Sequence, residues 1–173
     1  MTRLIEGKLA SDFPDLWRVT KYDDWAFYRN QFGSCCGGNK SVDFLGFNPT
    51  DRTLWLIELK DYRRFRREKD NKISLWEEVA IKARDTLAGL FAAKVEVGHD
   101  DHAFAQASLT VAKLRIVLHL EQPPTRTRLF PRAYDPADIR QKLKQMVKPI
   151  DPHPQVVELQ SMTRVPWNAE SVP

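Results

Sequence analysis

Residues 41–60 read SVDFLGFNPTDRTLWLIELK, and this stretch decides the fold that we expect. Two apolar runs flank the segment 48–51, whose residue types favour turns, so the stretch predicts a β-hairpin. Each run carries one carboxylate at a position where an apolar side chain is expected. These are Asp43 in the first run and Glu58 in the second.

The turn also predicts the register of the hairpin. An even-length turn centred between residues 50 and 51 pairs residues whose numbers sum to 101, so Phe47 should face Leu54 and Asp43 should face Glu58. Gly46 indicates either a bulge, which would shift this register by one residue, or a close approach of the backbone to a neighbour. Directly opposed residues have Cβ atoms about 4.5–5.5 Å apart, so the two carboxylates should be neighbours.

Lys60 follows Glu58 by two residues and therefore projects from the same side of its strand. Two carboxylates held together away from water must be protonated, paired, or bridged by a cation. We favour the cation, because hard oxygen ligands suit Mg²⁺ or Mn²⁺. The hairpin therefore predicts a site made of two acids and a lysine.

This spacing, Asp43, then fourteen residues, then Glu58-Leu59-Lys60, resembles that of the PD-(D/E)XK nuclease superfamily. The resemblance covers residues 41–91 best, and beyond them it extends only to the order of elements. Val42 stands where the family has proline, which leaves the metal ligands unaffected. The resemblance implies an α/β protein with the restriction-endonuclease-like three-layer α/β sandwich, in which helices flank a mixed central sheet.

The resemblance also implies a function, that of a metal-dependent nuclease that hydrolyses phosphodiester bonds, with DNA as the expected substrate. Asp43, Glu58 and Lys60 would be the catalytic residues. Asp43, Glu58 and the backbone carbonyl of Leu59 would bind Mg²⁺ or Mn²⁺, while Lys60 would position the attacking water and stabilise the transition state. Many members place another acid on a helix before the hairpin, and three candidates for it remain open: Glu6, Asp23 and Asp24.

The positive charge of the chain is concentrated directly after the predicted lysine. The formal net charge is +4, and the segment 60–72 alone holds seven basic and three acidic residues. Such a cluster at the mouth of the site could hold phosphates, although a solvated charged segment is the alternative interpretation. The candidate nucleic-acid contacts are Arg63, Arg64, Arg66, Arg67, Lys69 and Lys72.

Two other functions fit the same residues. One is a catalytically silent module with a nuclease-like fold that binds nucleic acid, and the other is a subunit that cuts only with a partner. A homodimer or larger complex would fit the cutting of two strands. The motif does not distinguish between DNA and RNA as the substrate.

Length and composition predict one nuclease-like domain over residues 1–173, with a loose C-terminal tail from residue 161 to 173. No apolar run approaches the roughly 20 residues of a membrane span. The N-terminus also lacks the apolar core of a secretory signal. We therefore expect a cytoplasmic protein without membrane contact. The adjacent Cys35 and Cys36 are expected to be buried.

The remaining pattern predicts further elements around the hairpin. Residues 74–93 form the clearest helix, with Ser74 and Glu77 as a capping box and with Lys82 and Arg84 expected in solvent. A helix is also expected within residues 14–32, and another from 136 to 147. Strands are predicted at 114–120, with His119 at a sheet edge, and at 155–160.

Overall fold

The computed structural model describes residues 1–64, 67, 72–96, 101–123 and 132–173. Its main feature is a five-stranded sheet with strand order β3-β4-β5-β6-β7. The β3–β4 and β4–β5 pairs are antiparallel, whereas β5–β6 and β6–β7 are parallel. The strands are β3 (Arg18–Lys21), β4 (Phe44–Asn48), β5 (Thr53–Asp61), β6 (Lys113–Glu121) and β7 (Gln155–Val157). The prediction of a mixed α/β protein with a mixed central sheet is therefore confirmed.

The hairpin has the predicted register. Phe47 faces Leu54, and five consecutive pairs run without a bulge from Asn48–Thr53 to Phe44–Ile57. Gly46 marks a close approach instead, because a Cβ atom at this position would lie 3.2 Å from the indole of Trp17.

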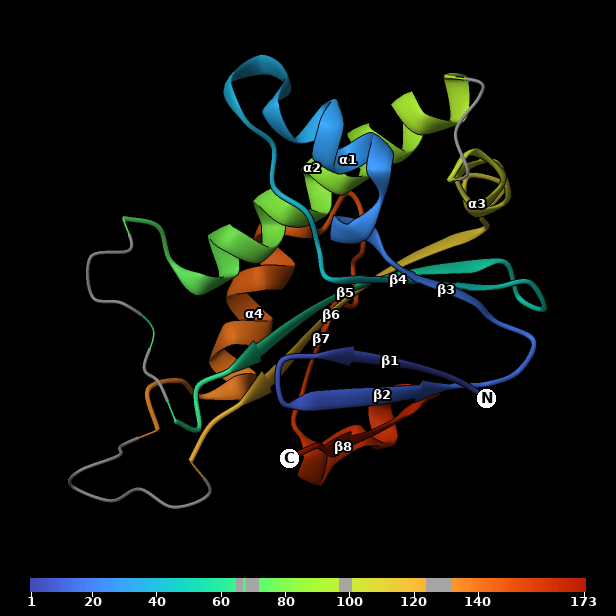
Figure 1. Ribbon diagram of the computed structural model, residues 1–173. Coiled ribbons are helices and arrows are strands. Elements are labelled where there is room, and N and C mark those ends of the chain that lie inside the picture. Colours follow the sequence, from blue (N-terminus) through green and yellow to red (C-terminus); the bar gives the residue numbers. More distant parts are fainter. Residues whose placement is uncertain (65–66, 68–71, 97–100, 124–131) are drawn as a thin grey trace.

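Helices cover one face of this sheet (Figure 1). The main ones are α2 (Leu75–Val95) and α4 (Pro136–Val147), which contact each other above the strands. The capping box at Ser74 and Glu77 is present, and Asp135 caps α4 by accepting from the amide of Ala137 at 2.8 Å. The shorter elements are η1 (Tyr22–Asp24), α1 (Ala26–Asn30), η2 (Phe32–Gly37), α3 (His102–Ser108) and η3 (Leu159–Arg164).

A second, three-stranded antiparallel sheet covers the other face, where the prediction of flanking helices is wrong (Figure 1). It has the order β1-β2-β8 and consists of β1 (Thr2–Glu6), β2 (Leu9–Phe13) and β8 (Asn168–Ser171). Phe44, Ile57 and Leu59 of the larger sheet pack against this layer, while Leu45, Leu54 and Leu56 pack against the helices. This alternation follows from the two-residue period of a strand.

The prediction of a loose tail over residues 161–173 is wrong. Strand β8 pairs with β2 near the N-terminus, and Trp167 is buried against the ring of Phe13. The prediction of a loose tail was based on its prolines, but none of these prolines lies in the segment 168–171 that pairs with β2. A buried tryptophan side chain removes a large apolar area from water and holds the segment in place.

The helix expected within residues 14–32 is present as the five-residue α1, which follows β3 and η1. Two smaller predictions are corrected. His119 lies in β6, which is paired on both sides, and not at a sheet edge. Cys35 and Cys36 are exposed free thiols. Among the described residues, no helix is long and apolar enough to cross a membrane.

Candidate active site

The two predicted carboxylates lie together at the open end of the hairpin. Asp43 immediately precedes β4, and Glu58 follows Ile57, which is paired with Phe44. Asp43 Oδ2 accepts a hydrogen bond from the backbone amide of Leu59 at 2.6 Å, which ties the first acid to the strand that carries the second. The side chain of Glu58 is fully buried.

Two lysines converge on the same carboxylate oxygen. Glu58 Oε1 lies 2.9 Å from Lys60 Nζ and 2.6 Å from Lys82 Nζ. Lys82 Nζ also lies 3.8 Å from Asp43 Oδ1, so this lysine bridges the two acids. The expectation that Lys82 points into solvent is wrong, because α2 packs over the hairpin and directs this side chain inward. The lysine therefore occupies the position of the cation that the carboxylate pair requires.

Glu78 on α2 adds a third acid to the cluster, and sequence reasoning missed it. Lys60 Nζ lies 2.9 Å from Glu78 Oε1, and Arg67 lies 2.8 Å from Glu78 Oε2. Glu78 precedes Lys82 by four residues, so both side chains lie on one face of the helix. In the sequence, the four-residue spacing of Glu78 and Lys82 beside the apolar stripe of α2 could have indicated that both side chains belong to the site.

The charges in the cluster shift several pKa values. Burial and the neighbouring Glu58 raise the pKa of Asp43 from 3.8 to about 7, against the opposing effect of Lys82. Burial alone would lower the pKa of Lys60, but Glu58 and Glu78 outweigh it and raise that pKa. Burial would likewise raise the pKa of Glu78, but hydrogen bonds from Arg67 and Lys60 lower it to about 2. Lys60 is therefore protonated at neutral pH, whereas Asp43 is close to its titration point.

The pKa of Asp43 predicts a pH-dependent stability in metal-free solution. Because this pKa is raised on folding, the native state binds more protons than the unfolded state between about pH 4 and 7, and stability falls as the pH rises through this window. Asp43→Asn should remove that fall and unfold less readily than the wild type above pH 7. The free energy of unfolding should rise by at most roughly 4 kcal/mol, at about 1.36 kcal/mol per unit of pKa difference between the folded and unfolded states.

Urea titrations at several pH values with EDTA present would measure this difference. Asp138→Asn is the matched control, because Asp138 is exposed and pairs only with Lys142 among the described residues. Parallel stability curves for the wild type and Asp43→Asn would contradict the prediction.

The donor atoms of the cluster fit a hard divalent cation. Glu58 Oε2 is buried and has no hydrogen-bond partner among the described residues, so it is available as a ligand. Carboxylate oxygens are the donors that Mg²⁺ and Mn²⁺ prefer. In the part of the chain that the structure describes, however, no group of three or more His, Cys, Asp or Glu side chains is arranged to hold a metal ion.

Two of the three candidates for a further acid, Glu6 and Asp24, are engaged elsewhere. Glu6 lies 2.7 Å from Lys21, and Asp24 lies 3.8 Å from Arg29. Asp23 lies in η1, which approaches the site because the amide of Tyr22 donates to the backbone carbonyl of Asp43 at 3.1 Å. The structure thus places η1 beside the backbone of Asp43, and a third ligand stays a prediction.

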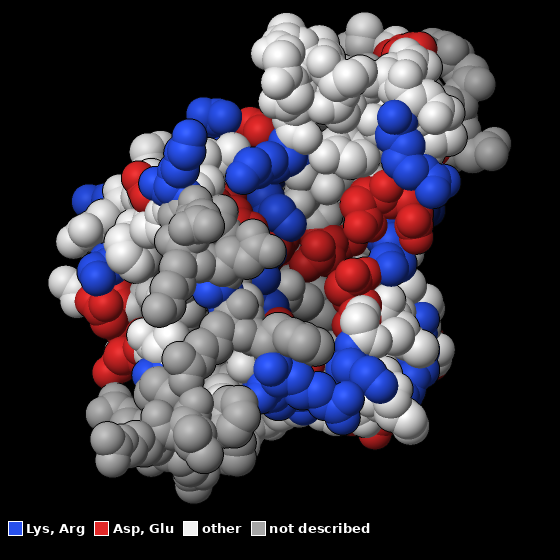
Figure 2. All heavy atoms as spheres, turned by 60° about the vertical axis from the view of Figure 1, so that its left-hand side comes forward, with Lys and Arg blue, Asp and Glu red and all other residues white. Residues whose placement is uncertain are grey.

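The predicted basic segment is only partly described. Arg66 and Lys69 lie outside the described residues. Arg67 is paired with Glu78, whereas Arg64 and Lys72 are exposed. On the face shown in Figure 2, acidic side chains form a band bordered by lysine and arginine side chains. Basic groups thus lie close to acidic ones on this face.

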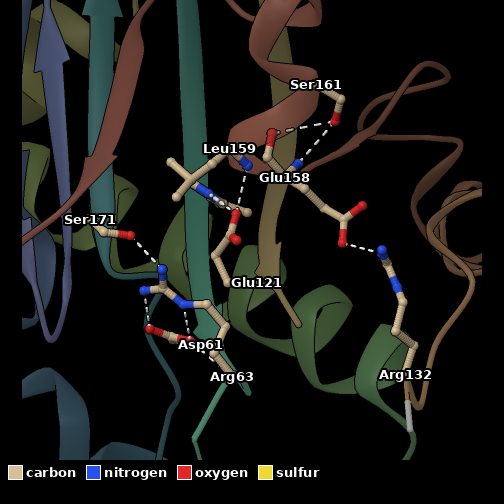
Figure 3. Close-up of polar contacts among 9 residues, drawn as sticks. Asp61, Arg63, Glu121, Arg132, Glu158, Leu159, Ser161 and Ser171 are labelled. Atoms are coloured by element: carbon tan, nitrogen blue, oxygen red, sulfur yellow. Dashed lines mark hydrogen bonds and ion pairs between the residues drawn. The ribbon is translucent and has the colours of Figure 1, made fainter. Parts of the chain in front are cut away.

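Arg63 helps to join the end of β5 to the C-terminal segment (Figure 3). Its guanidinium lies 2.6 Å from Asp61 Oδ2 and also donates to the hydroxyl of Ser171. Glu121, at the end of β6, accepts from the backbone amide of Leu159 at 2.6 Å. These contacts hold the ends of β5 and β6 against β8 and η3, so Arg63 has a structural role besides its positive charge.

The chain is 30% identical to a cysteine–tRNA ligase of Neisseria meningitidis (serogroup A, serotype 4A) over an alignment of 211 positions, gaps included, that covers 99% of this chain. The chain spans only 30% of the length of that ligase. No protein-family model and no solved structure matches the chain.

Proposed function

We propose that this protein is a metal-dependent nuclease of the PD-(D/E)XK type that hydrolyses phosphodiester bonds, with DNA as the preferred substrate. The observation that carries the proposal is the meeting of Asp43 and Glu58 at the open end of the hairpin, with Lys60 bound to Glu58. The mixed sheet, with helices α2 and α4 on one face and the three-stranded sheet on the other, supports a restriction-endonuclease-like three-layer fold as part of this proposal.

The carboxylates of Asp43 and Glu58 and the carbonyl of Leu59 would hold Mg²⁺ or Mn²⁺. When bound, the ion supplies a nucleophilic hydroxide near neutral pH and offsets negative charge on the phosphate. Lys60 remains protonated because its pKa is raised, so it donates hydrogen bonds to the attacking water and to the phosphate oxygens. Glu78 keeps this ammonium group in place at 2.9 Å.

The basic residues after β5 would hold the nucleic-acid backbone near these groups. Of the candidates, Arg64 and Lys72 are exposed and available for phosphate contacts, while Arg67 lies beside Glu78 at the edge of the cluster. Phosphate contacts position a nucleic acid without reading its sequence. The segment therefore favours cutting directed by structure or by a partner, and a homodimer would place two such sites on a duplex.

A second candidate function is a catalytically silent module that binds RNA. It is favoured by the similarity to a cysteine–tRNA ligase, whose name states that it acts on tRNA. It also accords with the two lysines that already neutralise Glu58, because a module without turnover needs no metal. Such a module, or a subunit active only with a partner, would bind nucleic acid through the same basic residues.

A cleavage assay distinguishes these functions. The purified protein and its Lys60→Ala variant are incubated with linear, circular, single-stranded and branched DNA and with tRNA, in Mg²⁺, Mn²⁺ or EDTA. We expect DNA cleavage that requires metal and is lost in Lys60→Ala. Salt-sensitive binding without cleavage of any substrate would overturn the nuclease proposal and favour the binding module or the partner-dependent subunit.

A further inference from the structure

A second basic site lies away from the carboxylates, between α4 and the edge strand β7. There a cavity of about 410 Å³ is lined by Arg140, Gln141, Lys144, His153 and Gln155, among others. Its volume is within the range of roughly 300–1,000 Å³ that is typical of small-ligand sites. No carboxylate is among the described residues that line it.

The cationic groups of this cavity come from one face of α4. Ala137, Arg140 and Lys144 recur at a spacing of three to four residues, which places them on the same side of the helix. Ile139 and Leu143 are buried on the core side of α4. The cavity therefore opens on the face of α4 that is turned away from the core.

Within the described part of the chain, Arg140 and Lys144 have no acidic partner. Among the described residues, neither Arg140 nor Lys144 forms an ion pair, whereas the neighbouring Lys142 is 2.8 Å from Asp138 and lies over the ring of Trp76. Two positive charges that share a cavity without a counter-charge repel each other, so an anion that enters between them relieves this repulsion.

The segment that carries His153 is firmly anchored. Asp151 is buried and accepts hydrogen bonds from the amide of Ile116 at 2.8 Å, from the amide of His153 at 2.9 Å and from the side chain of Arg115 at 3.1 Å. The side-chain amide of Gln155 donates to the carbonyl of His153 at 3.0 Å. These bonds order the cavity wall before any ligand binds, which lowers the entropic cost of binding.

We propose that this cavity binds a phosphate group, either of a free nucleotide or of a nucleic-acid backbone. The planar guanidinium of Arg140 can bind two phosphate oxygens, Lys144 adds a point charge, and the imidazole of His153 and the amide of Gln141 can donate further hydrogen bonds. The site does not depend on the nuclease proposal, because none of its lining residues belongs to the carboxylate cluster.

Binding measured in EDTA tests this proposal separately from cleavage. Calorimetric titrations use inorganic phosphate, AMP and a single-stranded oligonucleotide as probes, with the wild type and the double variant Arg140→Gln/Lys144→Gln. The control is Lys148→Gln, which changes an exposed lysine of the same region outside the cavity lining. Circular dichroism of each variant checks that it is folded.

We expect at least one probe to bind the wild type and the control equally and the double variant at least tenfold more weakly. Tight binding of AMP and phosphate would identify a free nucleotide as the ligand, whereas binding of the oligonucleotide alone would identify a nucleic-acid backbone. Equal affinity of the folded double variant and the wild type for every probe, or no binding of any probe to the wild type, would overturn the proposal.

Discussion

Glu58→Gln is expected to lower the rate of metal-dependent cleavage at least a hundredfold while the protein stays folded. Glutamine has the size and shape of the native side chain and can still accept hydrogen bonds from Lys60 and Lys82 at its carbonyl oxygen. It lacks the negative charge that a divalent ion requires. Removal of a single preorganised electrostatic group typically costs about 10²–10³ in rate.

Single-turnover cleavage at saturating protein would measure this loss without interference from binding. Asp43→Asn should lower the cleavage rate by a similar factor, because both carboxylates are proposed ligands of one ion. Glu170→Gln is the matched control, since Glu170 lies in β8, is exposed and should leave the rate unchanged. A rate for folded Glu58→Gln near that of the wild type would rule out Glu58 as a ligand.

Lys82→Met should lower the free energy of unfolding by about 2–3 kcal/mol in metal-free solution. Removing one partner of a buried ion pair typically costs about 3–5 kcal/mol, because the remaining charge stays buried. The expected cost is smaller here because Glu58 retains Lys60 at 2.9 Å. Methionine preserves most of the apolar length of the lysine side chain, so the loss reports mainly on charge.

Mg²⁺ should restore part of this stability. If Lys82 occupies the place of a cation between Asp43 and Glu58, the removal of its ammonium group makes room for Mg²⁺. Because Mg²⁺ would then bind only the native state, it stabilises that state. Urea unfolding with and without Mg²⁺, at matched ionic strength, measures the effect. Lys94→Met, on the exposed side of the same helix, should stay within about 0.5 kcal/mol of the wild type in both conditions.

If Mg²⁺ raised the free energy of unfolding equally for the wild type and Lys82→Met, this would contradict the role of Lys82 as the occupant of a cation site. Lys82 would then be a structural partner of Glu58 that does not compete with metal. No loss of stability in metal-free Lys82→Met would show instead that Lys60 alone suffices to neutralise Glu58.

The hairpin and the proximity of its two acids could be predicted from the sequence. The turn at 48–51 and the two-residue period of β4 and β5 set the pairing of Phe47 with Leu54, and this register carries Asp43 to Glu58. The capping box of α2 and the cap of α4 were equally readable. All these features depend on residues close together in the chain, whose conformations are limited by local sterics and hydrogen bonding.

Which other charged side chains contact the two acids depends on the packing of distant segments. Lys82 and Glu78 looked like ordinary charged residues of an amphipathic helix, and their contacts depend on how α2 is rotated over the sheet. The sequence likewise gave no sign that β8 would pair with β2 and bury Trp167. Contacts between distant segments follow from the packing of whole layers, because the free energy of burial depends on total apolar area and not on local sequence.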